Sequence, residues 1–332
     1  MKEVDMSESG RALSGKRAVV TGSSQGMGLE IARLLASEGA NVVLNARGSA
    51  GADDVEAAAR AIDAEGIGRA IARRGPVNDV GFAEELINAC VETFGGIDIL
   101  VNNAGITGGS QFSAVDTVPL ERWRDVLDVN LNGSFYTSRF AAPHMRKQRW
   151  GRIIHCVSGA AFGSIGGSCY AASKGGLVSL TYAMAADLGM FGVTVNCYAP
   201  QARSRLSDAS PEGFESMLRA RWRRGFCDEA EYQYCKGFPG PEGVAPWIGY
   251  LCLEEASYIN GRVFAVEGRR IGLHAAPREE RILWRQPETD QPWRLQSLRA
   301  IARQAFPIEN RWPKREEAEL QATLAETDFV FS

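Results

Sequence analysis

Residues 21–28 read Thr-Gly-Ser-Ser-Gln-Gly-Met-Gly, and this stretch decides the predicted fold. An apolar run at residues 17–21 leads into it, and apolar residues recur at helical spacing over residues 29–36 until Gly39 ends the helix. Residues 41–45 then read as a second strand, which completes a βαβ unit with two parallel strands. Glycines let a dinucleotide's pyrophosphate approach the backbone at the helix N-terminus, where free N–H groups and the helix dipole favour negative charge.

The spacing of this loop is Thr-Gly-x-x-x-Gly-x-Gly and differs from the Gly-x-Gly-x-x-Gly fingerprint. A tight strand-to-helix turn without a ligand is the alternative interpretation. Where the residue that meets an adenine ribose is expected, the sequence has Asn45-Ala46-Arg47 and no carboxylate. Arg47 could bind a 2′-phosphate bidentately, so the sequence favours NADP(H), and NAD(H) stays possible. An ordinary exposed arginine is the alternative for Arg47.

Helix-like and strand-like segments alternate along the following chain, without internal repeats. This alternation predicts an α/β fold, a doubly wound parallel sheet of Rossmann type with helices on both faces. The predicted strands are residues 17–21, 41–45, 68–73, 97–101, 151–157 and 193–198, and the predicted helices are residues 29–36, 53–65, 82–94, 120–145 (interrupted at Asn130) and 170–188.

Polar residues follow the predicted central strands, and open parallel sheets place their chemistry at these carboxyl ends. Ser158 ends one such strand, and Tyr170 follows twelve residues later with Lys174 one helical turn beyond it. Tyr232 and Lys236 repeat the spacing, but no strand-end serine precedes them. Lowering a tyrosine pKa from about 10 to near 7 requires about 4 kcal/mol, roughly what an ammonium about 4 Å away supplies at a dielectric of about 20. We therefore expect Lys174 to lower the pKa of Tyr170.

Five motifs occur together in an order and spacing that resemble the classical short-chain dehydrogenase/reductase family, over residues 15 to about 272. Within that family, residues 199–206 and 261–268 look most like the 3-hydroxyacyl-CoA dehydrogenase module of peroxisomal multifunctional enzymes. Gln201 replaces a usual glycine, Ala46 replaces the acid used for NAD, and Pro76 stands where many relatives have an aspartate. The five motifs are residues 21–28, residues 102–105, Asn130, Ser158 and residues 170–174.

The resemblance implies roles for particular residues. Ser158 would hydrogen-bond the substrate oxygen, Tyr170 would transfer a proton, and Lys174 would lower the tyrosine pKa and hold the nicotinamide ribose. Asn130 would hold a water that feeds Lys174. The catalytic residues are thus Asn130, Ser158, Tyr170 and Lys174. The cofactor-binding residues are Gly22, Ser24, Gln25, Gly26, Met27, Gly28, Arg47, Val77, Asn103, Ala104, Gly105, Tyr170, Lys174 and Pro200.

We expect residues 1–272 to form a dinucleotide-binding catalytic domain with a lid insertion at about 207–241. The insertion mixes aromatic residues with arginines, which suits a bulky apolar substrate with a phosphate, carboxylate or CoA group. A helix with one core face and one solvated basic face is the alternative. Residues 273–332 form a C-terminal extension with Trp284, Trp293 and Trp312, and these tryptophans predict packing on the same or a neighbouring subunit.

Composition restricts the partners. The net charge of −3 gives no basic surface for nucleic acid, and no stretch is apolar and long enough to span a bilayer, so we predict a cytoplasmic protein without a membrane span. The seven cysteines include no Cys-x-x-Cys pair and the three histidines lack metal-ligand spacing, which predicts no metal site. The resemblance implies a homodimer or homotetramer.

The predicted function is NADP(H)-dependent hydride transfer between the nicotinamide and a ketone or secondary alcohol. The substrate expected is bulky and hydrophobic or a thioester: a 3-oxoacyl compound, a steroid or a polycyclic ketone. The alternative is a catalytically silent dinucleotide-binding sensor or scaffold protein. The complete set Asn130, Ser158, Tyr170 and Lys174 argues for the enzyme.

Overall fold

A computed structural model of the chain describes residues 11–48, 54–107, 115–163, 167–202, 240–281, 283 and 295–306, with single helical positions between 215 and 233. The chain divides into two compact units, one of residues 1–274 with the last two residues, and one of residues 275–330. In the second unit, the structure describes helix α11 (Leu295–Ala305). The first unit contains the sheet and the candidate site.

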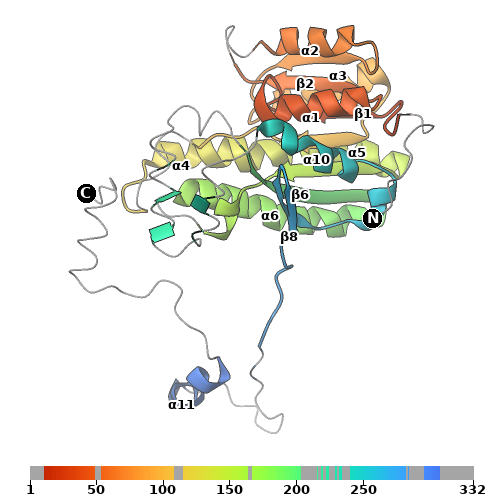
Figure 1. Ribbon diagram of the computed structural model, residues 1–332. Coiled ribbons are helices and arrows are strands. Elements are labelled where there is room, and N and C mark those ends of the chain that lie inside the picture. The colour runs from red at the N-terminus through yellow and green to blue at the C-terminus, as the bar shows by residue number, and fades with distance from the viewer. Residues whose placement is uncertain are drawn as a thin grey trace. The chain divides into compact units, whose positions relative to one another are not determined.

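The first unit is built on a sheet of eight strands in the order β3-β2-β1-β4-β5-β6-β7-β8 (Figure 1). Every pair of neighbours is parallel except β7 and β8, which are antiparallel. The predicted doubly wound α/β fold is confirmed. The strands are β1 (Arg17–Val20), β2 (Asn41–Ala46), β3 (Ala70–Arg74), β4 (Ile99–Asn102), β5 (Gly151–Cys156), β6 (Val193–Gln201), β7 (Val263–Glu267) and β8 (Arg270–Leu273).

The prediction of six strands was incomplete, because it missed β7 and β8. The helix that leads into β7, α10 (Ala245–Leu251), has only seven residues and contains Pro246 and Gly249, so its helical pattern is weak. Strand β8 is four residues long and mostly exposed, and therefore lacks the apolar run of a buried strand. Neither strand had the helix-strand alternation that identified the other six.

Helices cover both faces of the sheet. Ile31 of α1, Ile62 of α2 and Ile248 of α10 belong to the core on one face. Leu86 of α3 and Met145 of α5 belong to the core on the other face, together with residues of α6. The helices in chain order are α1 (Gly26–Ser37), α2 (Val55–Ala64), α3 (Val80–Phe94), α4 (Leu120–Leu127), α5 (Gly133–Gln148) and α6 (Ser168–Gly189), followed by α10, and short 3-10 turns lie at η2 (Gly159–Phe162), η3 (Pro241–Gly243) and η4 (Glu255–Tyr258).

The interruption predicted at Asn130 is confirmed. Helices α4 and α5 are joined without a break by a π-helical turn, η1 (Asp128–Asn132). Such turns insert one extra residue into a helix and are frequent at functional sites. Asn130 is completely buried in this turn, so the insertion directs its side chain into the protein.

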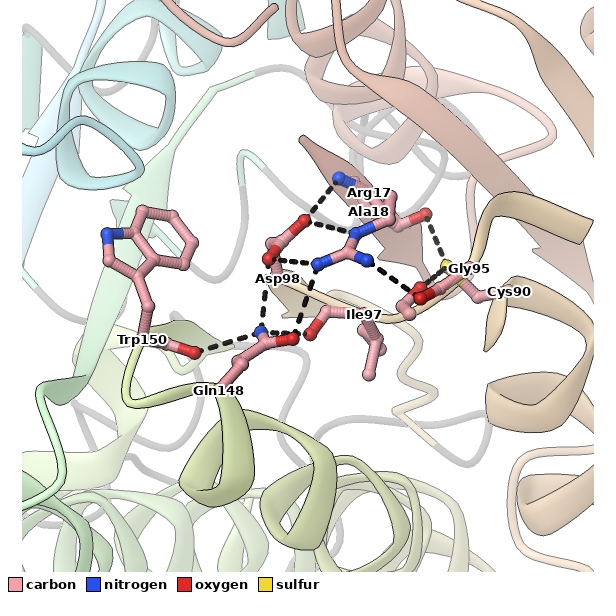
Figure 2. A network of polar contacts seen from close by, with 9 residues as sticks. Arg17, Ala18, Cys90, Gly95, Ile97, Asp98, Gln148 and Trp150 are labelled. Atoms are coloured by element: carbon pink, nitrogen blue, oxygen red, sulfur yellow. Dashed lines mark hydrogen bonds and ion pairs between the residues drawn. The ribbon is translucent and has the colours of Figure 1, made fainter. Parts of the chain in front are cut away.

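A polar network joins the amino ends of β1 and β4 to the end of α5 (Figure 2). The Arg17 guanidinium donates to the Asp98 carboxylate at 2.6 and 2.8 Å and to the Gly95 carbonyl at 2.8 Å. Gln148 accepts from Arg17 at 3.2 Å and donates to Asp98 at 3.0 Å. A Cβ on Gly96 would lie 2.3 Å from Arg17 Nη1, so glycine leaves room for the guanidinium. The network fastens the sheet at the end opposite the carboxyl ends of its parallel strands.

We predict that Arg17→Met lowers the free energy of unfolding by about 2–4 kcal/mol, because it leaves the Asp98 carboxylate, only 7% exposed, without its cation. Urea denaturation would measure this loss. Arg33→Met is the control, because Arg33 contacts Glu30 at 3.5 Å on an exposed surface, and its loss should cost under about 0.5 kcal/mol. Equal effects of the two substitutions would contradict the prediction.

Candidate active site

The loop between β1 and α1 has no room for side chains at two of its glycines. Gly22 has φ +62°, and a Cβ on it would lie 2.8 Å from Ala104 Cα. A Cβ on Gly28 would lie 2.4 Å from the Gly22 carbonyl oxygen and 2.6 Å from Asn103 Nδ2. Only glycine fits this approach between the end of β4 and the start of α1. The predicted cofactor-binding residues Gly22, Ser24, Gln25, Gly26, Met27 and Gly28 lie in this loop and in the first residues of α1.

Hydrogen bonds from Asn103 fix the loop to the end of β4. Its amide nitrogen Nδ2 donates to the carbonyls of Thr21 at 3.1 Å and Gly22 at 3.0 Å. In return, Thr21 Oγ1 accepts from the main-chain N–H groups of Asn103 and Ala104, both at 3.0 Å. The predicted residues Asn103, Ala104 and Gly105 therefore follow β4 directly beside the glycine loop.

Asn45 has a structural role that the sequence did not reveal. Its side-chain amide donates to the carbonyls of Arg73 at 3.2 Å and Gly75 at 3.1 Å, and its main-chain carbonyl accepts from Ser23 N at 2.8 Å. The side chain is 1% exposed. Asn45 thus joins the ends of β2 and β3 to the glycine loop. A polar residue in an otherwise apolar strand was the available signal.

Arg47 follows β2 directly and is exposed. No hydrogen bond or ion pair joins its side chain to another described residue. The next residue is held in place, because Arg74 donates to the Gly48 carbonyl at 2.7 Å and forms an ion pair with Glu56. An exposed guanidinium beside this braced turn, without a partner among the described residues, can reach an anion outside the protein surface.

Val77, another of the predicted cofactor-binding residues, is buried. It is 6% exposed, and a Cβ on Gly133 would lie 2.8 Å from Val77 Cγ2. Its side chain therefore packs against the start of α5. Any contact with a ligand through Val77 stays a prediction.

Ser158, Tyr170 and Lys174 converge at the carboxyl end of β5. Ser158 caps η2, where its Oγ accepts from Ala160 N at 3.2 Å, and its hydroxyl lies near enough to Tyr170 to lower the pKa of that phenol. Lys174 Nζ donates to the Cys156 carbonyl at 2.7 Å and lies 5.7 Å from the centre of the Tyr170 ring. Helix α6 thus directs both side chains back over the end of the strand that carries Ser158.

The side chain of Asn130 binds backbone near the other three residues. Its Oδ1 accepts from Ile106 N at 2.8 Å, and its Nδ2 donates to Ile106 O at 2.9 Å and Ser173 Oγ at 3.0 Å. A Cβ on Gly105 would lie 3.2 Å from Asn130 Oδ1 and 3.3 Å from Lys174 Nζ, so both side chains flank Gly105. Because the amide is already engaged, a water held for Lys174 would have to bind the main chain here, and that role stays a prediction.

Burial controls the acid–base properties of this group. It raises the pKa of the Tyr170 phenol, whereas the neighbouring Ser158 hydroxyl lowers it, and burial lowers the pKa of Lys174. The lowering of the Tyr170 pKa that we expected from Lys174 is not found in this structure. Lys174 Nζ donates to the Cys156 carbonyl, and removal of the phenol from water is the largest influence on the pKa of Tyr170. Tyr170 is consequently a neutral hydrogen-bond donor here.

His155 is a buried titratable residue that the sequence analysis did not select. It is 0% exposed, its Nδ1 accepts from Asn102 Nδ2 at 3.2 Å, and its Nε2 has no partner among the described residues. Burial, with a further contribution from Lys174, lowers its pKa from 6.5 to about 3. His155 is therefore neutral at all pH values where the fold is expected to persist. Its place within an apolar strand gave no sign of these contacts.

We predict that His155 makes the fold acid-sensitive. The unfolded chain takes up a proton at this residue near pH 6.5 but the folded chain only near pH 3, so stability falls as pH drops below 6.5. Between pH 7 and pH 5 the loss from this residue is about 2 kcal/mol. His155→Asn keeps an acceptor for Asn102. Between pH 7 and pH 5, the free energy of unfolding of this variant should fall by about 2 kcal/mol less than that of the unaltered protein. Urea denaturation at both pH values measures it, and equal losses in the two proteins would refute it.

Pro200, a predicted cofactor-binding residue, lies at the end of β6 beside β7. In the sheet register, Pro200 of β6 is opposite Val266 and Gln201 is opposite Glu267. Glu267 is 3% exposed and accepts from Arg270 Nη1 at 3.0 Å. Gln201, which replaces a usual glycine of the family, continues the strand pairing here.

Much of the predicted lid and extension lies outside the described residues. In the 207–241 insertion, Trp222 stacks on Tyr232 with ring centres 5.1 Å apart. Lys236 and the tryptophans at 284, 293 and 312 are outside the described part of the chain, so the packing predicted for the extension stays a prediction. Among the described residues, no cluster of three His, Cys, Asp or Glu side chains could hold a metal ion, and none of the described helices is long and apolar enough to cross a membrane.

The chain belongs to the short-chain dehydrogenase/reductase family and is an oxidoreductase of that family. The family's sequence model, described as short chain dehydrogenase, matches residues 16–206, more than half of the chain. Members of this family bind a nicotinamide dinucleotide. The resemblance inferred from the five motifs is thereby confirmed at the level of the family.

Similar proteins include two kinds of curated enzyme and one solved structure. A D-beta-hydroxybutyrate dehydrogenase of Rhizobium meliloti is 34% identical, over 76% of this chain and 97% of the relative. A 3-oxoacyl-(acyl-carrier-protein) reductase FabG of Staphylococcus aureus is 36% identical, over 76% of this chain and 97% of the relative. The crystal structure of a short chain dehydrogenase from Mycobacterium avium has a TM-score of 0.70 and 31% identity, over 89% of this chain and 95% of that one.

Proposed function

We propose that this protein is an NADP(H)-dependent oxidoreductase that interconverts a ketone and a secondary alcohol on a bulky hydrophobic or thioester substrate. The observation that carries the proposal is the convergence of Ser158, Tyr170 and Lys174 on the end of β5. The Ser158 hydroxyl lowers the pKa of the neighbouring Tyr170 phenol, and Lys174 Nζ donates to Cys156 O at 2.7 Å. A substrate carbonyl oxygen bound between the two hydroxyls would accept hydrogen bonds from both.

The glycine loop fits a dinucleotide. Gly22 and Gly28 leave no Cβ between the backbone and the start of α1, whose first N–H groups have no partners within the helix. With the dinucleotide bound, its nicotinamide would supply or accept the hydride. Tyr170 would donate the proton to the substrate oxygen, and the Ser158 hydroxyl would orient that oxygen. The residues proposed to hold the dinucleotide are those of residues 22–28 named above, with Arg47, Val77, Asn103, Ala104, Gly105, Tyr170, Lys174 and Pro200.

Tyr170→Phe tests the mechanism. The substitution removes the proton donor but keeps the ring, so kcat should fall at least about 100-fold while the cooperative unfolding transition persists. The assay is dinucleotide-coupled turnover with 3-oxoacyl thioesters, steroids and polycyclic ketones. Tyr182→Phe, on the same helix, is the matched control and should change kcat less than about twofold.

Two results would count against this mechanism. Retention of more than a tenth of the turnover by Tyr170→Phe would remove Tyr170 as the proton donor. Absence of turnover by the unaltered chain across the whole substrate panel, together with dinucleotide binding, would favour the silent sensor or scaffold.

The cofactor preference rests on Arg47. Its exposed guanidinium, which has no partner among the described residues and lies beside a braced turn, supports binding of a 2′-phosphate, and charge-assisted hydrogen bonds of this kind are worth about 1.5–3 kcal/mol. Arg47→Ala should therefore raise the Kd for NADPH about 10- to 100-fold and change that for NADH less than about twofold. Isothermal titration measures both. Arg60→Ala, at an exposed position of α2, is the control. Equal binding of NADH and NADPH before and after the Arg47 substitution would disprove the preference.

The names of the relatives narrow the substrate. Both D-beta-hydroxybutyrate dehydrogenase and 3-oxoacyl-(acyl-carrier-protein) reductase are named for an oxygen on the β carbon of an acyl chain. This supports the thioester part of the proposal, including a 3-hydroxyacyl-CoA as in the peroxisomal module. The stacked Trp222 and Tyr232 support an aromatic lid at about 207–241. Steroids and polycyclic ketones are the alternative substrates in the panel.

We also propose a homodimer or homotetramer in the cytoplasm, with residues 273–332 packed on the same or a neighbouring subunit. Leu120 and Trp123 of α4 and Phe135 of α5 are 65%, 39% and 43% exposed, more apolar surface than a lone subunit needs. Sedimentation of the purified chain as a monomer would contradict the assembly.

A further inference from the structure

Tyr198 is a buried hydroxyl that the proposed reaction does not use. It lies on β6 between its register partners Cys156 and Phe264, two residues before Pro200, and is 0% exposed. Its phenol donates to Asn103 Oδ1 at 3.1 Å. Burial raises the pKa of Tyr198, so the phenol keeps its proton and remains a donor. The hydroxyl thus joins the carboxyl end of β6 to Asn103, the residue that holds the glycine loop.

The donation from Tyr198 completes the hydrogen bonding of the Asn103 amide. Asn103 Nδ2 donates to the carbonyls of Thr21 and Gly22 at 3.1 and 3.0 Å. A reversed amide would place its oxygen against both carbonyls, so these carbonyls direct the NH2 group at the loop. The Tyr198 hydroxyl holds the other side of the amide through Oδ1. Loss of the phenolic hydroxyl would leave Oδ1 without this donor and the amide less firmly held.

The peptide group between Gly22 and Ser23 is held at both of its ends, at one of them by the Asn103 amide. The Gly22 carbonyl accepts from Asn103, and the next N–H, that of Ser23, donates to the Asn45 carbonyl at 2.8 Å. The close approach of Gly28 to Asn103 Nδ2, 2.6 Å from the position of a Cβ, leaves no space for the amide to shift toward α1. A change at Asn103 is therefore transmitted to the backbone that would meet a pyrophosphate.

We propose that Tyr198 is a positioning residue for dinucleotide binding, whose hydroxyl acts through Asn103 to hold the glycine loop in its binding conformation before the ligand arrives. The inference rests on the proposed function, since it requires that the chain binds a dinucleotide. Preorganisation of this kind raises affinity because the loop is already ordered before binding, so no binding free energy is lost in ordering it. The effect should be the same for NADH and NADPH, since the part of the ligand expected at the loop is the pyrophosphate, which both dinucleotides share.

Tyr198→Phe tests the proposal. We expect the Kd values of NADPH and NADH, measured by titration of cofactor fluorescence, to rise together by about threefold to tenfold. The KM for the cofactor should rise with them, while kcat at saturating cofactor stays within about twofold. In the chain without added dinucleotide, hydrogen exchange at the amides of residues 21–23 should become faster.

Thr137→Val is the matched control, because Thr137 Oγ1 donates to Oδ1 of the neighbouring Asn102 at 2.7 Å and is also fully buried. The substitution deletes the hydroxyl that donates to Asn102, the asparagine adjacent to Asn103, and Asn102 does not contact the loop. Both Kd values should therefore stay within about 1.5-fold of those of the unaltered chain. Unchanged Kd values in Tyr198→Phe, or equal rises in both variants, would overturn the positioning role. If the unaltered chain binds neither dinucleotide, the proposed function fails as well. If the unaltered chain and Tyr198→Phe bind a dinucleotide equally well, only the positioning role fails.

Discussion

The hydrogen bonds from Asn103 to the carbonyls of Thr21 and Gly22 are the constraint on which the rest of the site depends. Parallel neighbouring strands end at the same edge of a sheet, but that alone does not fix the loops that follow them. Here one amide joins the loop after β4 to the loop after β1. Glycine is needed at positions 22 and 28 because a Cβ there would clash with the facing loop or with Asn103. The glycine loop and the residues beside Lys174 are consequently joined at one edge of the sheet.

The two ends of the sheet differ in how their charged and titratable groups are paired. At the amino ends, Arg17 and Asp98 are paired and fully hydrogen-bonded, so their charges stabilise the fold. At the carboxyl ends, Lys174 is 2% exposed with a main-chain carbonyl as its neighbour, and His155 is buried without a partner for Nε2 among the described residues. Groups kept in unfavourable protonation conditions cost stability and are typical of functional sites. The carboxyl ends of the parallel strands are therefore the part of the first unit where buried titratable groups cost stability.

The sequence predicted the fold and the site where the signal was local. Glycine spacing, strand-end polar residues and the interruption at Asn130 could all be read from neighbouring residues. Tyr198 could not, because it lies in a continuous apolar strand and its partner Asn103 is 95 positions away. The pKa direction of Tyr170 was also out of reach, since the spacing to Lys174 gives proximity but not the depth of burial or the competing carbonyl of Cys156.

Asn102 and Asn103 show how one strand end can hold two different parts of the fold. Adjacent residues of an extended chain point to opposite faces of a sheet. The amide of Asn102 is hydrogen-bonded to hydroxyls and a carbonyl of α5 and lies beside His155, whereas that of Asn103 is hydrogen-bonded to Tyr198 and to the glycine loop. A distortion of the end of β4 would hence disturb the contacts with α5 and with the glycine loop together, whereas a change at Arg17, at the far end of the same strands, would lower stability without moving either.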